Sequence, residues 1–596
     1  MSTTVNEGTA GEPRLLDPEN RHRQQDLLRV ENLRVGFGEK RDVTEIVHGV
    51  SFSLAPGECL AIVGESGSGK SVSARTLVGL TGGSSHVSAD RMEFDGRDLL
   101  SFKDRDWRGL RGKDIGFILQ DALVSLDQLR PVGKEIDEAL KLHDWGPRRE
   151  RQERVIELME LVGIPEPEVR AHMRPYELSG GLRQRALIAS AIAMDPKLII
   201  ADEPTTALDM TVQAQVLEQL QAAKARGKAL ILISHDLAVV SQLADTVAVM
   251  AGGDILEYAP AAQLFSRPEH SYTQRLIEAI PSAESRGARL SPVERKASLG
   301  TARAYEDAGA PVLKAERLFK HFRGPDGVTR TVVNDVSFEL KQGETLGIVG
   351  ESGSGKTTTA RLALALLEVD GGGVTLAGEE WSGLPERERR KRRADISVIY
   401  QDPLSSFDPR WTVEQIMLDA LGEGYDSKAA RKARITELLE MVGLEAEHLP
   451  RRPLQLSGGQ RQRVAIARAL GPQPRVIVCD EPVSALDVSI QAQVLDLLAD
   501  LQDELNVSYL FISHDLGVIH HISDRVLVMC DGKVVEFGDA DDVLLRPHHP
   551  YTKKLVAALP ALERPEPTGP RPFGRPPRKG RPAPAGAPDY SEELAA

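Results

Sequence analysis

The stretch Gly64-Glu-Ser-Gly-Ser-Gly-Lys-Ser71 decides the fold, and the chain contains it again as Gly350-Glu-Ser-Gly-Ser-Gly-Lys-Thr357. Both copies fit the pattern G-x-x-x-x-G-K-[ST], and each follows an apolar run, 60–63 or 346–349, that predicts a buried strand. A chance match or a plain turn is the alternative for one copy, but two copies in the same context make it remote. Strand, glycine-rich loop and helix, found twice, predict two sites for a nucleoside triphosphate.

The residue types in these loops match the chemistry of phosphate binding. Glycines let the backbone turn its N–H groups towards phosphate oxygens, and the lysine neutralises the outer phosphates. The hydroxyl groups of Ser71 and Thr357 are candidate ligands of Mg²⁺. The candidate phosphate-binding residues are Gly64, Ser66, Gly67, Ser68, Gly69 and Lys70 in the first loop, and Gly350, Ser352, Gly353, Ser354, Gly355 and Lys356 in the second.

Length and composition exclude several classes of protein. At 596 residues the chain is too long for one core, and its 41% hydrophobic and 27% charged residues are typical of a globular protein. The net charge of -14 disfavours nucleic-acid binding. No apolar run approaches the ~20 residues that span a bilayer. The three cysteines, Cys59, Cys479 and Cys530, lie in or beside apolar runs, which predicts small buried residues rather than a disulfide or metal framework. We expect a cytosolic protein.

The phosphate loop belongs to a unit that the chain repeats. Lys356 follows Lys70 by 286 positions and Asp480 follows Asp202 by 278, so whole domains are duplicated, with short insertions in the first. Each domain is expected to have an α/β core and an inserted helical subdomain, because 151–164 and 432–444 carry apolar residues at helical spacing. We predict a disordered leader at 1–26, domains at 27–282 and 312–561, a flexible linker at 283–311 and a disordered Pro/Arg-rich tail at 562–596.

Two acids close an apolar run in each half, Asp202-Glu203 and Asp480-Glu481. Ligands of parallel sheets bind beyond the carboxyl ends of the strands. The first acid is therefore predicted to hold Mg²⁺, usually through water, and the second to deprotonate an attacking water. The alternative, that these acids cap a turn, loses weight beside a phosphate loop.

A serine and two glycines precede a helix-forming run in each half, Ser179-Gly180-Gly181 and Ser457-Gly458-Gly459. Such a helix start presents N–H groups and a hydroxyl to an anion. This predicts a second protein face for the nucleotide, with a plain helix N-cap as the alternative.

The motifs occur in the order seen in ABC ATPases, which the chain resembles over almost all of 27–282 and 312–561. They are the phosphate loop, a glutamine after an apolar strand (Gln120, Gln401), Leu-Ser-Gly-Gly, Asp-Glu-Pro, Ala-Leu-Asp (207–209, 485–487) and Ile-Ser-His-Asp (233–236, 512–515). The resemblance implies two tandem P-loop ABC-type nucleotide-binding domains, each with a RecA-like α/β core, an antiparallel β portion and a helical subdomain.

The resemblance also implies that the two halves dimerise head to tail around two ATP molecules. One site would use Lys70, Ser71, Gln120, Asp202, Glu203 and His235 with Ser457, Gly458, Gly459 and Gln460. The other would use Lys356, Thr357, Gln401, Asp480, Glu481 and His514 with Ser179, Gly180 and Gly181.

Further roles follow by the same resemblance. Glu203, Glu481, His235, His514, Gln120 and Gln401 would be catalytic, and Ser71, Gln120, Asp202, Thr357, Gln401 and Asp480 would hold Mg²⁺ directly or through water. The histidines would contact the γ-phosphate, although a satisfied core histidine is the alternative. Phe37 and Phe322 would stack on adenine, with a core aromatic as a serious rival. Because both halves keep every acid, lysine and histidine, we expect two hydrolysing sites.

Two further segments resemble the ATPase subunits of bacterial dipeptide, oligopeptide, glutathione and nickel importers, which can be fused in tandem. They are 401–410 (Gln-Asp-Pro-Leu-Ser-Ser-Phe-Asp-Pro-Arg) and the domain endings His-Ser-Tyr-Thr at 270–273 and His-Pro-Tyr-Thr at 549–552. This implies two integral-membrane permease subunits, an extracytoplasmic solute-binding protein and a peripheral position at the cytoplasmic face of the cell membrane. Peptide, nickel and glutathione remain open as the solute.

The first half departs from this pattern at Ala122 and Gln128, where the second has Pro403 and Pro409. The two halves are therefore expected to contact different permease chains. Many relatives carry a cysteine cluster that ligates an iron–sulfur cluster, but this chain has no cysteine in 283–311 or after Cys530, so none is expected. The rival class is a soluble twin ATPase of the ABC-F kind that acts on ribosomes, but 283–311 is short and lacks the long helical linker of those proteins.

Overall fold

The computed structural model describes residues 26–39, 42–120, 122–205, 210–282, 285–292, 311–324, 327–421 and 427–557. These residues form two compact units, a first that extends to Ile277 and a second that extends from Glu278 and also includes Met210 and Thr211. The predicted tail and all but the last residue of the predicted leader lie outside the described residues.

A six-stranded sheet forms the centre of unit 1, with strand order β11-β10-β3-β9-β8-β7. All neighbouring strands are parallel except β10 and β11, which form an antiparallel pair at one edge. Every residue of β3, β8 and β9 is buried, as their continuously apolar sequences predict. The strands are β3 (Cys59–Val63), β7 (Ile115–Ile118), β8 (Leu198–Asp202), β9 (Ala229–Ile233), β10 (Thr246–Ala251) and β11 (Asp254–Pro260).

A second sheet in unit 1 is antiparallel, with order β2-β1-β5-β6 and β4 also paired to β1. Its apolar face shares one core with α1 (Lys70–Thr76) and with residues of the parallel sheet such as Ile62 and Ile231. The helix that follows the phosphate loop is thus held from two sides. The strands are β1 (Leu28–Glu39), β2 (Asp42–Leu54), β4 (Ser85–Ser88), β5 (Arg91–Phe94) and β6 (Arg97–Asp98).

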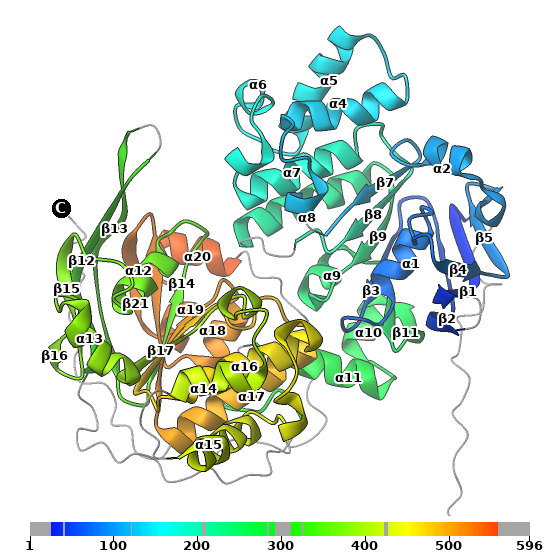
Figure 1. Ribbon diagram of the computed structural model, residues 1–596. Coiled ribbons are helices and arrows are strands. Elements are labelled where there is room, and N and C mark those ends of the chain that lie inside the picture. Colours follow the sequence, from blue (N-terminus) through cyan, green and yellow to red (C-terminus); the bar gives the residue numbers. More distant parts are fainter. Residues whose placement is uncertain are drawn as a thin grey trace, which may run out of the picture. The chain divides into compact units, whose positions relative to one another are not determined.

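The remaining helices of unit 1 include the inserted subdomain, in which α4, α5 and α6 stand together beyond α7 (Figure 1). The predicted helix at 151–164 lies largely within α5, and its buried residues Val155, Leu158 and Met159 face the interior. The helices are α2 (Asp104–Leu110), α3 (Ala122–Ser125), α4 (Val132–Leu142), α5 (Arg148–Leu161), α6 (Pro167–Arg170), α7 (Gly180–Ala191), α8 (Met210–Ala225), α9 (Leu237–Leu243), α10 (Ala261–Ser266) and α11 (Ser271–Glu278).

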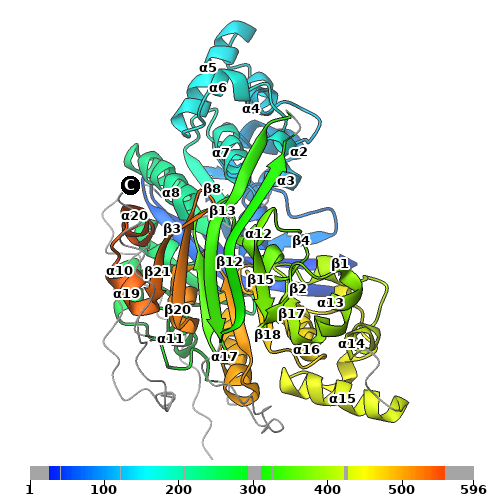
Figure 2. The same cartoon turned by 90° about the vertical axis from the view of Figure 1, so that its left-hand side faces the viewer.

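Unit 2 repeats this architecture, with sheet orders β17-β18-β19-β14-β20-β21 and β13-β12-β15-β16. The long antiparallel pair β12 and β13 is prominent in Figure 2. The strands are β12 (Pro311–Arg323), β13 (Thr329–Lys341), β14 (Thr345–Val349), β15 (Gly371–Leu376), β16 (Glu379–Glu380), β17 (Ile396–Ile399), β18 (Val476–Asp480), β19 (Ser508–Ile512), β20 (Arg525–Cys530) and β21 (Lys533–Asp539). The helices are α12 (Lys356–Ala363), α13 (Glu386–Arg392), α14 (Val413–Leu421), α15 (Lys428–Met441), α16 (Gly458–Leu470), α17 (Val488–Leu505), α18 (Leu516–Ile522), α19 (Ala540–Leu545) and α20 (Pro550–Ala557). The predicted duplicated fold is confirmed.

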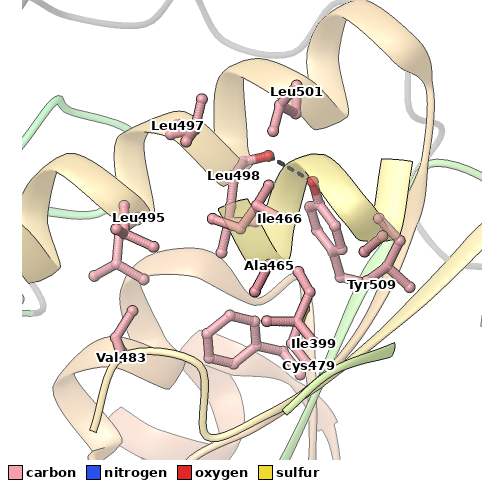
Figure 3. Close-up of a cluster of buried hydrophobic side chains, with 14 of the residues drawn as sticks. Ile399, Ala465, Ile466, Cys479, Val483, Leu495, Leu497, Leu498, Leu501 and Tyr509 are labelled. Carbon is pink, nitrogen blue, oxygen red and sulfur yellow. Dashed lines mark hydrogen bonds between the residues drawn. The ribbon is translucent and has the colours of Figure 1, made fainter. Parts of the chain in front are cut away.

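The core of unit 2 packs α16 and α17 onto the parallel sheet (Figure 3). Tyr509 of β19 is fully buried, and its hydroxyl donates a hydrogen bond to the carbonyl oxygen of Leu498 at 2.9 Å. Cys479 lies in this core and Cys59 is buried in unit 1, as predicted, whereas Cys530 is only partly buried. Burial raises the pKa of the Cys59 thiol to about 12, so this thiol stays protonated at neutral pH.

The start of the predicted linker is bound to unit 2. The carboxylate of Asp496 on α17 is buried and accepts hydrogen bonds from the N–H groups of Leu290 (3.1 Å) and Ser291 (2.9 Å) and from the Ser291 hydroxyl (2.9 Å). Arg289 donates two further bonds to Asp500, at 2.9 and 3.0 Å. The expectation of a flexible linker at 283–311 is therefore not met for 285–292, because these hydrogen bonds hold the segment and the Leu290 side chain is buried in the hydrophobic core of unit 2. Residues 293–310 lie outside the described residues.

We predict that Asp496→Asn releases this segment. Asparagine has the same shape but turns an N–H group towards one of the donors, so the contact loses hydrogen bonds and gains a donor–donor conflict. Hydrogen exchange of the Leu290 and Ser291 amides should become about tenfold faster or more. Glu218→Ala, an exposed acid on α8, is the control and should leave this exchange unchanged. Unchanged exchange in Asp496→Asn would contradict the assigned contact.

Candidate functional site

The first phosphate loop joins the end of β3 to the start of α1 through a close approach to β10. Gly64 has φ 148°, and a Cβ atom placed on it would lie 2.0 Å from the carbonyl oxygen of Met250. Only glycine fits this position. Gly69 is the left-handed N-cap residue of α1, with φ 98°. The loop of unit 2 has the same geometry, since a Cβ on Gly350 would lie 2.2 Å from the carbonyl oxygen of Met529.

The lysine of each loop is buried and reaches back across it. Lys70 Nζ donates to the carbonyl oxygens of Gly64 and Glu65, both at 2.7 Å. Lys356 Nζ makes the corresponding bonds in unit 2, at 2.8 and 2.9 Å. These bonds fix a positive charge at the N-terminus of a helix, where the helix dipole also favours an anion.

The hydroxyl that follows each lysine meets the first acid of the acidic pair. Ser71 Oγ donates to Asp202 Oδ1 at 2.8 Å, and Thr357 Oγ1 donates to Asp480 Oδ1 at 3.3 Å. Burial raises the pKa of both aspartates. Asp202 Oδ2 is buried and has no hydrogen-bond partner among the described residues. A hydroxyl and a buried carboxylate with an unsatisfied oxygen fit the oxygen ligands that Mg²⁺ prefers, so these residues fit the expected ion.

The second acid of each pair is held by the glutamine and the histidine. Gln120 Nε2 donates to Glu203 Oε2 at 2.9 Å, and His235 Nδ1 lies 3.4 Å from Glu203 Oε1. In unit 2, the corresponding groups of Gln401 (2.7 Å) and His514 (3.2 Å) meet the same Oε2 atom of Glu481. The structure therefore brings the predicted glutamate, glutamine and histidine together in each unit.

Both glutamates have a strained backbone. Glu203 has φ 51° and Glu481 has φ 49°, a left-handed conformation that is uncommon outside glycine, asparagine and aspartate. Residues held in such conformations cluster at functional sites. Each glutamate N–H donates to a strand, Glu203 to the Ile233 carbonyl at 2.9 Å and Glu481 to the Ile512 carbonyl at 3.0 Å. Sequence reasoning did not find this strain, since the proline after each acid pair favours an extended rather than a left-handed glutamate.

Charge pairing decides the protonation of Glu481 and His514. Burial alone would raise the pKa of Glu481, but the hydrogen bond and charge of His514 outweigh it and the pKa is lowered. Burial alone would lower the pKa of His514, but Glu481 outweighs that effect and the pKa is raised. The glutamate is therefore kept as a carboxylate, the form in which it can accept a proton.

The Ser-Gly-Gly segments begin helices, as predicted. Ser179 is the N-cap of α7 and Ser457 the N-cap of α16, and each hydroxyl accepts a hydrogen bond from the backbone of its own helix. The second glycine of each segment is closely covered, because a Cβ atom placed on Gly181 or Gly459 would lie 2.7 Å from the side chain of Val212 or Ile490. The role of these segments as a second face for nucleotide stays a prediction.

The two predicted adenine-stacking residues differ in their surroundings. Phe37 is partly buried and packs against the core of unit 1, which suits the core-aromatic alternative as well as stacking. Phe322 is 41% exposed, with the Lys320 ammonium 5.7 Å from its ring centroid. Their predicted role in stacking on adenine stays a prediction.

A tyrosine that sequence analysis used only as a family marker contacts the phosphate loop of unit 2. The hydroxyl oxygen of Tyr551 accepts a hydrogen bond from the N–H of Glu351 at 3.0 Å. His549 Nδ1 accepts from the Tyr551 N–H at 3.2 Å, and Glu536 accepts from the N–H of His549 at 3.2 Å. Unit 1 repeats the last two bonds with His270, Tyr272 and Glu257. The domain ending of unit 2 therefore supports its loop directly.

The family model described as "ABC transporter" matches residues 47–206 and 333–484, and that of the oligopeptide/dipeptide transporter C-terminal region matches 256–304 and 535–586. The glutathione import ATP-binding protein GsiA of Pectobacterium atrosepticum is 43% identical over 92% of this chain and 91% of its own length. GsiA of Escherichia coli (strain K12) is 41% identical over 90% of each chain. A solved dimer of the ATP-binding cassette MJ0796 aligns with 38% of this chain and 98% of its own, at 30% identity and TM-score 0.36.

The chain belongs to the ABC transporter family, as a tandem pair of ATP-binding domains that each carry the oligopeptide/dipeptide transporter C-terminal region. The predicted class of protein, a fused tandem ATPase of the peptide-importer type, is confirmed, and the protein is an ATPase. Within the described residues, no helix has both the length and the apolar character needed to cross a membrane.

We predict a pH-dependent loss of stability in His514→Gln. The pKa of Glu481 is lowered, so its contribution is present at neutral pH and is lost as the pH falls through that lowered pKa. The pKa of His514 is raised, so its contribution is lost as the pH rises through that raised pKa. The variant should therefore lose about 1–3 kcal/mol between these two pKa values, and less outside them.

Urea unfolding of unit 2 across a pH series would measure this difference. His548→Gln, an exposed histidine of the same unit, is the control and should leave the unfolding free energy unchanged at every pH. A difference between His514→Gln and wild type that does not change with pH would show that the pair is not ionic.

Proposed function

We propose that the chain energises uptake of a small peptide-like solute through separate permease subunits. The observation that carries the proposal is the double occurrence of one complete site, with phosphate loop, hydroxyl–aspartate pair and strained glutamate in each unit. Two equivalent ATP-hydrolysing units without a membrane-crossing helix among the described residues are consistent with an ATPase subunit that powers transport through other, membrane-spanning chains.

Each ATP would lie between the phosphate loop of one unit and the Ser-Gly-Gly segment of the other. In this head-to-tail arrangement the phosphate loop and the Ser-Gly-Gly segment would both bind phosphate, since both are helix starts that present N–H groups to an anion. Lys70 and Lys356 would bind the outer phosphates, and Mg²⁺ held near Asp202 and Asp480 would neutralise phosphate charge. ATP binding would close the two units and hydrolysis would reopen them, so the reaction resets a switch.

The chemical step would belong to Glu203 and Glu481. Each carboxylate would accept a proton from the attacking water, while the glutamine (Gln120 or Gln401) and the histidine (His235 or His514) together orient that carboxylate. The strained backbone and the two bonds fix the carboxylate before substrate arrives, which favours reaction by preorganisation.

We predict that Glu203→Gln with Glu481→Gln binds ATP but does not turn it over. Glutamine keeps the shape but cannot accept a proton, so kcat should fall about 100-fold or more. The ATP dissociation constant should stay within about twofold, because phosphate binding rests on the loops. Steady-state ATPase rates and nucleotide titration measure the two quantities. Glu218→Gln is a surface control, and near-normal turnover in the double variant would exclude the assigned base.

The segments that follow Gln120 and Gln401 are proposed to contact two different permease chains. In unit 1 this segment exposes Val124 (82%) and Leu129 (81%), an aliphatic surface that a partner could cover. In unit 2 the equivalent stretch has the ion pair between Asp408 and Arg410 and the partly exposed Trp411. Two surfaces of different chemistry favour two distinct partners. An exchange of the two segments should impair transport and leave ATP binding intact.

Glutathione or another small peptide is the proposed solute, supported by the names of the relatives and by the C-terminal region that the chain shares with oligopeptide transporters. A solute-binding protein outside the membrane would deliver it, and the chain would lie at the cytoplasmic face. No nucleic acid takes part in this proposal. The absence of an iron–sulfur cluster and ATP hydrolysis at both sites also stay predictions.

A partner assay tests the proposal. The Glu203→Gln, Glu481→Gln variant should be trapped in its closed state, so cross-linking in cells followed by purification should recover two polytopic membrane proteins. Cells that lack the chain should also fail to take up labelled glutathione, and the wild-type gene should restore uptake. Recovery of ribosomal subunits without membrane proteins would exclude the importer and favour the ABC-F alternative.

A further inference from the structure

The first turns of the two Ser-Gly-Gly helices are built differently. In unit 2 the Ser457 hydroxyl accepts a hydrogen bond from the Gln460 N–H at 3.2 Å, and the Ser457 N–H donates to Gln460 Oε1 at 3.0 Å. This reciprocal pair is a capping box. In unit 1 the Ser179 hydroxyl accepts from the N–H of Leu182 at 3.4 Å, and a leucine side chain cannot return a bond. Two hydrogen bonds between Ser457 and Gln460 therefore hold the start of α16, whereas one bond between Ser179 and Leu182 holds the start of α7.

A buried histidine extends the network in unit 2. His448 is 7% exposed, its Nδ1 lies 3.1 Å from the carbonyl oxygen of Glu445, and its Nε2 lies 3.2 Å from Nε2 of Gln460. A carbonyl oxygen only accepts, so Nδ1 carries the proton of the neutral ring and Nε2 accepts from the Gln460 amide. Both ends of the glutamine side chain are thus assigned, Oε1 to Ser457 and Nε2 to His448.

We propose that His448 is a positioning residue for the ATP site that contains Lys70. The proposal rests on the head-to-tail arrangement, in which Ser457, Gly458 and Gly459 complete that site. His448 holds Gln460, and Gln460 holds Ser457, so the segment is fixed in the conformation that presents its hydroxyl and N–H groups to phosphate.

The site that contains Lys356 has no equivalent support among the described residues. Its second face is the segment at Ser179, where Leu182 replaces the glutamine. His448 precedes Ser457 by nine residues, and the same spacing before Ser179 gives Arg170. The two ATP sites therefore differ in how firmly their second face is preorganised, although their acids, lysines and histidines are the same.

Preorganisation should affect nucleotide binding and leave the chemical step unchanged. A segment that is already ordered loses less conformational entropy when it closes on ATP, so removing His448 makes closure more costly. The hydrogen bonds of His448 lead to Glu445 and Gln460 and not to an acidic pair. The loss of uniform binding raises KM without lowering kcat.

The test is steady-state ATPase kinetics of the full chain. His448→Ala should raise the apparent KM for ATP about threefold to tenfold and leave kcat within about twofold. His448→Gln should restore much of the wild-type KM, because its Oε1 can occupy the place of the imidazole Nε2 and accept from Gln460. Arg170→Ala, at the same spacing before Ser179, is the matched control in the other unit and should leave KM unchanged.

Three outcomes would overturn the proposal. They are a wild-type KM in His448→Ala, an equal defect in His448→Gln, and a fall in kcat at unchanged KM, which indicates a merely structural role. Ser457→Arg separates this proposal from the proposed function. If Ser457→Arg keeps wild-type turnover, the head-to-tail arrangement itself fails. If it abolishes turnover while His448→Ala behaves as wild type, only the role of His448 fails.

Discussion

The close approach between each phosphate loop and the neighbouring strand is the constraint on which the rest of the structure depends. A carbonyl oxygen of β10 or β20 lies where a side chain at Gly64 or Gly350 would begin. The loop must therefore pass over that strand before it turns into its helix. This path requires β3 between β9 and β10, and it places the lysine above the carboxyl edge of the sheet. Asp202 at the end of β8 and the following Glu203 lie at the same edge of the sheet.

Strain and charge then set the chemistry at that edge. A left-handed backbone at Glu203 and Glu481 directs each carboxylate between a glutamine and a histidine. In unit 2 the histidine keeps the glutamate ionised in spite of its burial. The neighbouring aspartate is in the opposite situation, since burial raises its pKa and a cation beside it would favour its ionised form. The pKa values of two adjacent acids are thus shifted in opposite directions by their surroundings.

The two units share a fold but not every contact. The segment 285–292 binds unit 2 through Asp496 and Asp500, whereas the corresponding helix of unit 1 has an exposed glutamate, Glu218, in place of the first. The network of His448 and Gln460 is likewise confined to unit 2 among the described residues. The two units carry the same set of candidate catalytic residues, and they differ in the residues that hold them.

The amino-acid sequence by itself determined the family, the duplication and the set of candidate residues. These are local properties, because a phosphate loop needs its glycines and lysine in consecutive positions and a buried strand needs a continuous apolar run. Only the tertiary structure decided how the residues act on one another. The strain at Glu203 and Glu481, the contact of Tyr551 with the loop, the attachment of 285–292 and the link from His448 to Gln460 each depend on polar groups that are separated in sequence or on backbone geometry. No periodic pattern records such contacts, since a single hydrogen bond constrains two positions and leaves their neighbours free.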